Sequence, residues 1–267
     1  DAPIKYSTGN RGYFYEDPDF SINDIPLTEN DLEAISFAAK TLMQFKDIEM
    51  FKQFGSAIDK IVDRVAVSQT EEAEQFIQFE STASDGGSEF LSPLLEAIKR
   101  KVWVEFEYAS FVSGELKPRR VIPLLLKQYS NRWYLISFDE SKNDYITYAL
   151  DRIEDLIVMT EKFVELIDFK PDNYFKHAIG ITSGNTPPET IVLRASIVAA
   201  KYLDSLPFHS SQKVKEMKDE YVEFSLFVNV SEELIRAILS YGGEIKVQEP
   251  KTLKDELQSR AKKILEN

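Results

Sequence analysis

Three segments decide the fold of this chain: Arg119-Arg120-Val121-Ile122-Pro123-Leu124-Leu125-Leu126, Arg132-Trp133-Tyr134-Leu135 and Ile146-Thr147-Tyr148-Ala149-Leu150-Asp151-Arg152-Ile153. Each segment is short, apolar and rich in aromatic or branched side chains. Polar stretches separate them, Tyr129-Ser130-Asn131 after the first and residues 139–144 after the second. This alternation is typical of consecutive strands in a small antiparallel sheet.

The segment before them extends the same pattern. Val102, Val104, Phe106 and Tyr108 alternate with more polar residues, and a helical apolar spacing precedes them in residues 90–101. We therefore expect one helix followed by five strands, near residues 102–109, 118–127, 132–138, 145–150 and 153–159. Five short strands with tight connections predict a small β-barrel closed on itself, which would leave no exposed strand edge.

The same residues carry a family resemblance. Arg119-x-x-x-Pro123, then Trp133-Tyr134-Leu135, then Leu150-Asp151-Arg152-Ile153 resembles the WYL-domain family of bacterial transcriptional regulators. Three ordered motifs are far more specific than a lone tripeptide. The resemblance implies an Sm/SH3-like five-stranded β-barrel that senses a ligand, such as a nucleotide or single-stranded nucleic acid, and signals to a DNA-binding domain.

The N-terminal residues predict a hairpin. Ile4-Lys5-Tyr6 and Tyr13-Phe14-Tyr15 flank a turn rich in Gly and Asn. In the resembled family a winged helix-turn-helix precedes the sensor, and this hairpin resembles its wing. We interpret residues 1–25 as the remnant of that domain, whose DNA-reading helices are missing; a native N-terminal hairpin is the alternative.

Residues 26–88 are predicted to form a helical linker. Thr28-x-x-Asp31 resembles a capping box, and Leu32, Ile35 and Leu42 then recur at helical spacing. Such stripes usually form an intramolecular core. The resemblance implies a second role for these helices, the formation of a homodimer.

The rest of the chain divides into three parts. Residues 89–162 are predicted to form the barrel. In residues 163–188, several Pro and Gly residues interrupt regular secondary structure, which predicts a connector that packs on another part of the protein. Residues 189–267 follow the order βαββαβ plus a final helix after Pro250, which predicts a ferredoxin-like C-terminal extension domain. The predicted fold class is thus α+β.

Composition excludes several function classes. Among the 267 residues there is no cysteine, and the only histidines are His177 and His209, so thiolate chemistry, metal sites and a Ser-His relay are not expected. We expect no cofactor and no enzyme, because no base or nucleophile is identifiable. No apolar stretch approaches the roughly 18 residues of a membrane span, so a cytoplasmic location and no membrane partner are expected.

Charge is unevenly distributed along the chain. The formal net charge is −13, which repels a polyanion as a whole. Between Lys99 and Arg132, however, eight basic residues stand against three acidic ones, so this window carries +5 and the remainder −18. The local excess coincides with the family motifs.

Three arginines are the candidate ligand-binding cations. Arg119, Arg120 and Arg152 belong to neighbouring strands or strand ends, and guanidinium groups bind phosphate bidentately and stack on bases. We expect them to converge at the mouth of the barrel. The alternative is that Arg152 pairs with Asp151 or a nearby Glu, and that Arg119 and Arg120 are solvated.

Four further residues complete the predicted ligand site. Trp133 and Tyr134 point to opposite faces of their strand, so one of them belongs to the core. Tyr108 and Ser110 end the first strand and resemble family positions near the pocket; a capped strand end is their alternative. An arginine common a few residues before the Leu-x-Arg-Ile segment is replaced here by Ile146, which makes a smaller or less charged effector more plausible.

Two functions remain open. The first is the ligand-sensing part of a transcriptional regulator, in which an anionic effector, a nucleotide or a short nucleic acid, controls DNA binding by the missing N-terminal domain. The second is a single-stranded nucleic-acid-binding module that acts through the barrel arginines and stacked aromatics.

Overall fold

The computed structural model describes residues 4–9, 11–16, 34, 38, 86–111, 114–163, 169–183 and 187–266. The chain divides into two compact units, Asp1–Ala83 and Ser84–Asn267. The predicted helical linker, residues 26–88, lies outside the described residues except for 34, 38 and 86–88. In the described part of the chain, no helix has the length and apolar character needed to cross a membrane.

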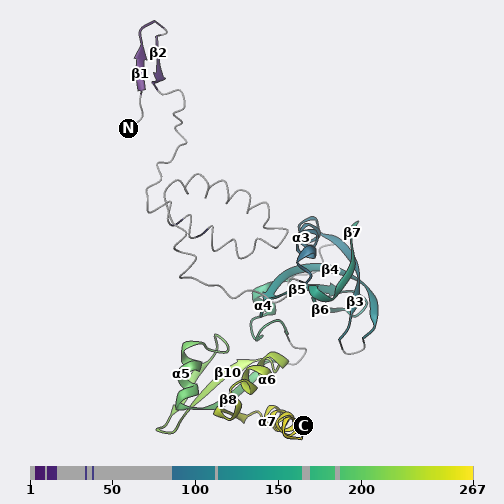
Figure 1. Ribbon diagram of the computed structural model, residues 1–267, viewed down its shortest axis with the longest axis vertical. Helices are drawn as coiled ribbons and strands as arrows, with labels where there is room; N and C mark the ends of the chain where they lie inside the picture. Colours follow the sequence, from purple (N-terminus) through teal and green to yellow (C-terminus); the bar gives the residue numbers. More distant parts are fainter. Residues whose placement is uncertain are drawn as a thin grey trace. The chain divides into compact units, whose positions relative to one another are not determined.

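The predicted N-terminal hairpin is present (Figure 1). Strand β1 (Ile4–Ser7) pairs antiparallel with β2 (Gly12–Tyr15), and Ile4 lies opposite Tyr15. Its aromatic side chains are largely solvated, with Tyr13 79% exposed. The existence of the hairpin is confirmed, and its interpretation as a wing stays a prediction.

A short amphipathic helix opens the second unit. The 3-10 turn η3 (Ser88–Phe90) runs directly into α3 (Leu91–Arg100), whose Leu91, Leu94 and Ala97 are fully buried. Lys101 ends the helix in the left-handed region, with φ 57°, and the chain enters strand β3 (Val102–Ala109) at once. The helix and the strand confirm the prediction for residues 90–109.

The first sheet contains the five predicted strands. After β3 come β4 (Leu116–Tyr129), β5 (Arg132–Asp139), β6 (Asp144–Ala149) and β7 (Ile153–Lys162). Their order is β6-β5-β4-β3-β7, and every neighbouring pair is antiparallel. The long β4 is shared, because residues up to Val121 pair with β3 and those from Ile122 onward pair with β5.

The predicted barrel closure is wrong. Strands β6 and β7 stand at opposite edges of the sheet order, and no backbone pairing between described residues joins them. The cause lies in the connection between them: the 3-10 turn η4 (Leu150–Arg152) carries the chain out of β6, and Ile153 then pairs with Tyr108 of β3. The sheet is therefore open, although its strands follow the predicted sequence ranges closely.

Residues 169–183 of the connector pack against the first sheet. Lys127 Nζ donates to the Gly180 carbonyl at 2.8 Å and lies 3.4 Å from the centre of the Phe175 ring, and burial lowers the pKa of this amine. Tyr174, in the short helix α4 (Pro171–Tyr174), lies 5.1 Å from the ring of Tyr145. The sequence predicted a connector that packs but not this helix.

The C-terminal part has the predicted βαββαβ order, followed by a helix (Figure 1). The elements are β8 (Glu189–Ser196), α5 (Ile197–Ser205), β9 (Lys213–Met217), β10 (Tyr221–Val228), α6 (Glu232–Leu239), η5 (Gly242–Glu244), β11 (Ile245–Glu249) and α7 (Lys251–Leu265). The strands form one antiparallel sheet in the order β11-β8-β10-β9. Ser196 and Ser231 begin α5 and α6 by accepting backbone N–H bonds from Ala199 and Leu234, which satisfies otherwise unpaired donors.

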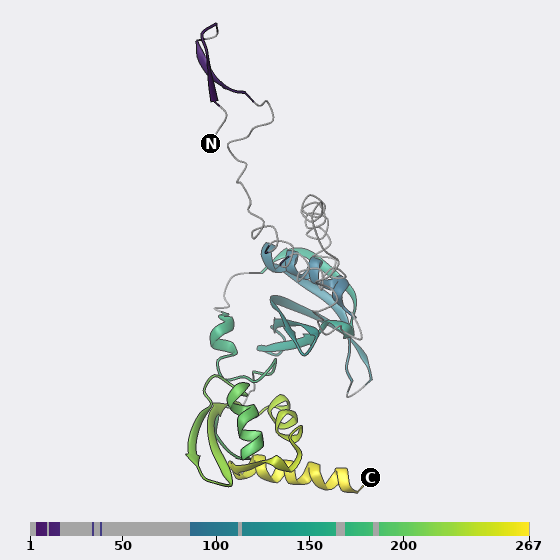
Figure 2. The same cartoon turned by 60° about the vertical axis from the view of Figure 1, so that its left-hand side comes forward.

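One apolar core holds this part together. The helices contribute Ala199, Ala200, Leu203, Leu234, Ile235, Ile238 and Leu253, and the strands contribute Ile191, Leu193, Ala195, Val222, Phe224, Leu226, Val228, Ile245 and Val247. The alternate residues of β8 and β10 thus face the helices, and Figure 2 shows the helices gathered beside this sheet. Ile179 of the connector joins the same core, so the connector also packs on this domain.

Candidate functional site

Aromatic residues from β3 and β6 meet on the interior side of the first sheet. The rings of Tyr108 and Tyr148 lie 4.8 Å apart and nearly perpendicular, and Phe106 lies 5.1 Å from Tyr148. Tyr108 Oη accepts the backbone N–H of Ala149 at 3.3 Å, so Tyr108 is fixed at both its ring and its hydroxyl. All three rings are at least 92% buried, which makes them a rigid platform rather than a mobile surface.

Arg152 packs on this platform. Its guanidinium carbon lies 5.0 Å from the centre of the Tyr108 ring and 4.4 Å from that of Phe111, which are cation–π distances. The Nε atom of Arg152 is buried and has no hydrogen-bond partner in the described part of the chain. The expected alternative, a pairing of Arg152 with Asp151 or a nearby Glu, is not observed among the described residues; Asp151 instead lies 3.7 Å from Arg132.

Arg119 approaches the platform from β4. It lies opposite Phe106 in the β3–β4 register, and its positive charge acts on the Tyr148 hydroxyl. Its Nη1 donates to the Pro118 carbonyl at 3.2 Å, whereas its Nε is buried without a partner among the described residues. We call Arg119, Arg152, Tyr108 and Tyr148 the arginine–tyrosine cluster.

Arg120 does not join this cluster. Its side chain stacks on Trp103, with the guanidinium carbon 4.9 Å from the ring centre. Glu161 binds its Nη2 at 2.5 Å, and Glu105 lies 3.8 Å from its Nε. The expected convergence of three arginines is therefore reduced to two, because neighbouring strand residues point to opposite faces of a sheet.

The other predicted site residues do not all lie at the cluster. Tyr134 lies where the charges of Asp151 and Arg152 reach its hydroxyl, and burial raises its pKa, so it borders the cluster. Trp133 precedes it in β5 and therefore points to the other face. Ser110 closes the loop after β3, because its carbonyl accepts the Gly114 N–H at 2.8 Å.

Tyr148 and Phe111 are the site residues that the sequence reasoning missed. Burial raises the pKa of the Tyr148 hydroxyl to about 12, with the Arg119 charge opposing the rise, so the hydroxyl stays protonated in neutral solution. Its oxygen is buried and unpaired among the described residues. The available signal was the alternation of Ile146, Tyr148 and Leu150, which puts a phenol on an apolar face.

The cluster therefore presents hydrogen-bond donors without acceptors. Neither Arg119 nor Arg152 forms an ion pair with a carboxylate in the described residues, and Tyr148 adds a neutral O–H donor. Unpaired buried donors beside two positive charges favour an anionic group. The described residues also contain no group of three or more side chains able to hold a metal ion.

Replacing Tyr148 with Phe tests whether the hydroxyl is unpaired. We expect the Tyr148→Phe variant to gain about 1 kcal/mol in free energy of unfolding without ligand, because a buried donor without a partner is removed. Urea unfolding monitored by circular dichroism measures this change. A loss of stability of similar size would mean that the hydroxyl has a partner and would remove it from the site.

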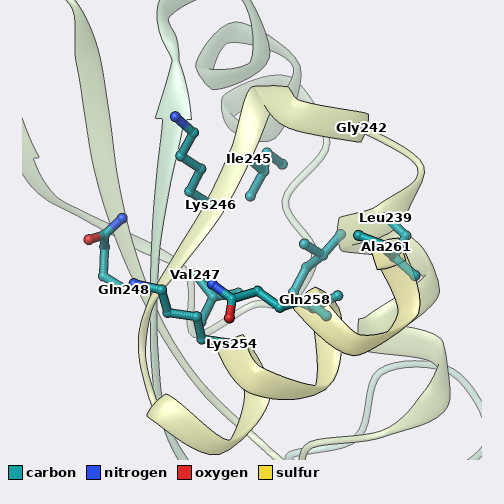
Figure 3. A pocket seen from close by; sticks show the side chains of 11 residues that line it. Leu239, Gly242, Ile245, Lys246, Val247, Gln248, Lys254, Gln258 and Ala261 are labelled. Carbon is teal, nitrogen blue, oxygen red and sulfur yellow. The ribbon is translucent and has the colours of Figure 1, made fainter. Parts of the chain in front are cut away.

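A hollow lies in the C-terminal domain (Figure 3). It encloses about 290 Å³ between the end of α6, strand β11 and helix α7. Its lining residues are Ile238, Leu239, Gly242, Ile245, Lys246, Val247, Gln248, Lys254, Leu257, Gln258 and Ala261. The walls are mainly apolar, and none of the described residues that line them is acidic.

Comparison with known proteins agrees with this division of the chain. A family model described as the WYL domain matches residues 89–158, and one described as the WCX domain matches residues 187–265. The chain contains a WYL domain and a WCX domain. Its WYL domain contains the arginine–tyrosine cluster, and its WCX domain contains the hollow beneath α7.

Two solved structures are similar to the chain over most of its length. Proteasome accessory factor B/C (PafBC) of Arthrobacter aurescens is 18% identical with a TM-score of 0.34, and the match covers 95% of this chain and 36% of that chain. A CRISPR Cas-related protein is 13% identical with a TM-score of 0.47, over 94% of this chain and 74% of that chain. This chain thus spans about a third of the PafBC chain. No curated protein matches it.

Proposed function

We propose that this chain is the ligand-sensing regulatory part of a bacterial transcriptional regulator, and that its effector binds at the arginine–tyrosine cluster. The presence of WYL and WCX domains supports a regulatory protein. The observation that carries the proposal is the pair of guanidinium groups, Arg119 and Arg152, that flank two packed tyrosines without a carboxylate partner in the described residues.

The effector is an anion with a planar or phosphate-bearing group, such as a nucleotide or a short nucleic acid. Arginine side chains bind phosphate through paired N–H donors. The tyrosine rings are buried and support the site, because Tyr108 packs against the Arg152 guanidinium. Tyr134 borders the site, and Ser110 directly precedes Phe111, which packs on Arg152. Because Arg120 is held by Glu161, it contributes less than the sequence suggested.

Regulation then follows from a shift between two arrangements of the chain. An effector that binds one arrangement more tightly increases its population, and a DNA-binding domain preceding this segment responds. Lys127 and residues 175–180 offer a route, since the connector contacts β4 on one side and the core of the WCX domain on the other. A homodimer in the cytoplasm, with residues 26–88 as dimerisation segment and residues 189–267 as a ferredoxin-like domain, belongs to the same proposal.

Native mass spectrometry of the full chain tests this function. The chain is mixed with a panel of nucleotides and short oligonucleotides at equal ionic strength, and bound masses report both the ligand and the oligomeric state. We expect one anionic ligand per chain, lost in the Arg119→Ala/Arg152→Ala variant. The absence of any bound member, or equal binding by the variant, would contradict the proposal.

The alternative is a single-stranded nucleic-acid-binding module acting through the same arginines. The observation in its favour is the +5 charge of residues 99–132 in a chain of net charge −13. The two functions separate by salt dependence, because each neutralised phosphate of a single strand steepens the fall of log affinity against log salt by about 0.7. A shallow slope, matching one or two contacts, supports a small effector, and a steep one supports the module.

A further inference from the structure

The hollow beneath α7 has walls that are fixed by the core of the WCX domain. Its floor consists of Ile238, Ile245 and Val247, which are buried members of that core. Leu239 and Leu257 line its sides and pack against the same core. Because a close-packed core holds these side chains in place, the hollow is present before any ligand binds.

Helix α7 lies over the hollow and is anchored at two points. Leu253, in its first turn, is 1% exposed and belongs to the apolar core. Arg260, about two turns later, donates from Nη1 to Glu232 Oε1 of α6 at 2.7 Å. Closing α7 onto β11 would break these contacts, so the helix keeps the hollow open.

Small residues leave the space between the anchors unfilled. Ala261 brings only a methyl group to the wall that α7 contributes. At Gly242, a Cβ atom would meet no atom of the described residues within 4 Å. The volume of about 290 Å³ has room for a molecule of roughly ten non-hydrogen atoms, because one water takes up about 30 Å³ in the liquid.

The polar side chains of α7 at the hollow favour a negatively charged group. Lys254 and Gln258 lie one turn apart on the helix, and both extend from it toward β11 (Figure 3). Within the part of the chain that the structure describes, neither side chain has a hydrogen-bond or ion-pair partner. None of the described lining residues is acidic, although the chain as a whole carries a net charge of −13.

The cation that a ligand would meet in the hollow is Lys254. Lys246 alternates with Ile245 and Val247 along β11, so its side chain points to the other face of the strand and extends away from α7 (Figure 3). The charge of Arg260 is already balanced by Glu232 and Glu256. One ammonium group beside apolar walls suits one carboxylate.

We propose that the hollow beneath α7 is a second ligand site, which takes a small monocarboxylate with an aliphatic chain of about eight carbons. The carboxylate accepts from Lys254 Nζ and from the Gln258 amide, and the chain covers the apolar floor. A phosphate-rich ligand is disfavoured, because the apolar walls would leave its remaining charged oxygens without donors. This site does not depend on the function proposed for the arginine–tyrosine cluster.

Methyl NMR of the full chain with octanoate tests the proposal. Octanoate has about ten non-hydrogen atoms, matching the volume of the hollow, and is added below the concentration at which it forms micelles. We expect saturable shifts of the Ile238, Ile245 and Val247 methyl signals. Octylamine, with a similar chain and the opposite charge, should cause much smaller shifts. The absence of saturable shifts with octanoate, or equal binding of octylamine, would overturn the proposal.

Variants of α7 separate the volume of the hollow from its charge. Ala261 is exposed, so Ala261→Trp should fold normally while filling the hollow, and octanoate binding should be lost. Lys254→Gln keeps the volume but removes the charge, and it should bind about tenfold more weakly. Lys262→Gln removes an exposed charge of the same helix that does not line the hollow, and it should change affinity less than about twofold. Wild-type affinity in Ala261→Trp would contradict the site.

A last variant shows whether octanoate binds at the arginine–tyrosine cluster instead. The Arg119→Ala/Arg152→Ala chain retains every residue that lines the hollow, so it should bind octanoate with unchanged affinity. A loss of octanoate binding in this variant would place the ligand at the cluster and overturn the second site.

Discussion

The Gly87→Ala variant should lose about 3 kcal/mol or more of its free energy of unfolding. Gly87 precedes η3 with φ 84°, a region that residues with a side chain rarely adopt. A Cβ atom there would lie 2.3 Å from the Leu150 carbonyl carbon, 2.5 Å from its oxygen and 2.6 Å from the Asp151 nitrogen. These are backbone atoms of η4, which cannot rotate away as a side chain would. Urea unfolding measures the loss.

A matched control separates the clash from the conformational cost. Gly114 also has positive φ, 65°, in the same domain, but a Cβ atom there would meet no atom of the described residues within 4 Å. We expect Gly114→Ala to lose only about 1 kcal/mol, the ordinary cost of the left-handed region. Equal losses in the two variants would contradict the close packing of η3 on η4. That packing matters for function, because η4 contains Arg152.

Removing both cluster arginines should nearly abolish effector binding. Each guanidinium contributes a charge-assisted contact of about 1.5 kcal/mol or more, so the Arg119→Ala/Arg152→Ala variant should bind about a hundredfold more weakly. Isothermal titration calorimetry with the tightest ligand of the nucleotide and oligonucleotide panel measures the change. The single variants should each lose about tenfold.

Arg120→Ala is the control for this loss. It removes the same charge one residue away, but from a guanidinium that Glu161 already holds and that stacks on Trp103. We expect its affinity to change less than threefold, an effect of about 0.6 kcal/mol. A hundredfold loss in Arg120→Ala would mean that net charge, rather than the cluster, determines binding.

Alternation in the sequence predicted the strands well, because a half-buried strand must repeat its apolar residues every second position. Predicted residues 102–109 match β3 (Val102–Ala109), and the final helix matches α7 (Lys251–Leu265). Alternation could not predict that the first sheet stays open. Which strands pair depends on the 3-10 turn η4 and on the register of β7 against β3, and neither leaves a periodic signal.

The candidate site was only partly predictable for a related reason. Strand geometry places Arg119 and Arg120 on opposite faces of the sheet, but it does not show which of the two arginines lies on the face of the cluster. In the structure Arg120 forms an ion pair with Glu161 of β7, a residue distant in the sequence, and this pair holds Arg120 on the other face. Tyr148 was not among the predicted site residues, because its role depends on burial. The residue is only 2% exposed, and it lies between partners from β3 and β4 that bury its hydroxyl.

His177 and His209 illustrate the same limit. They lie far apart in the sequence, yet the connector brings them close together at the WCX domain. Only the return of the chain after α4 makes this contact. Contacts between distant segments depend on tertiary packing, which local patterns do not encode.

A crystal structure of the full chain with the tightest anionic ligand of that panel tests the central claim most directly. We predict an anionic group of the ligand within hydrogen-bond distance of both Arg119 and Arg152, with Tyr148 Oη donating to it or to an adjoining polar atom. Ligand bound instead in the hollow beneath α7, or on Arg120 alone, with the guanidinium groups of Arg119 and Arg152 untouched, would contradict the account.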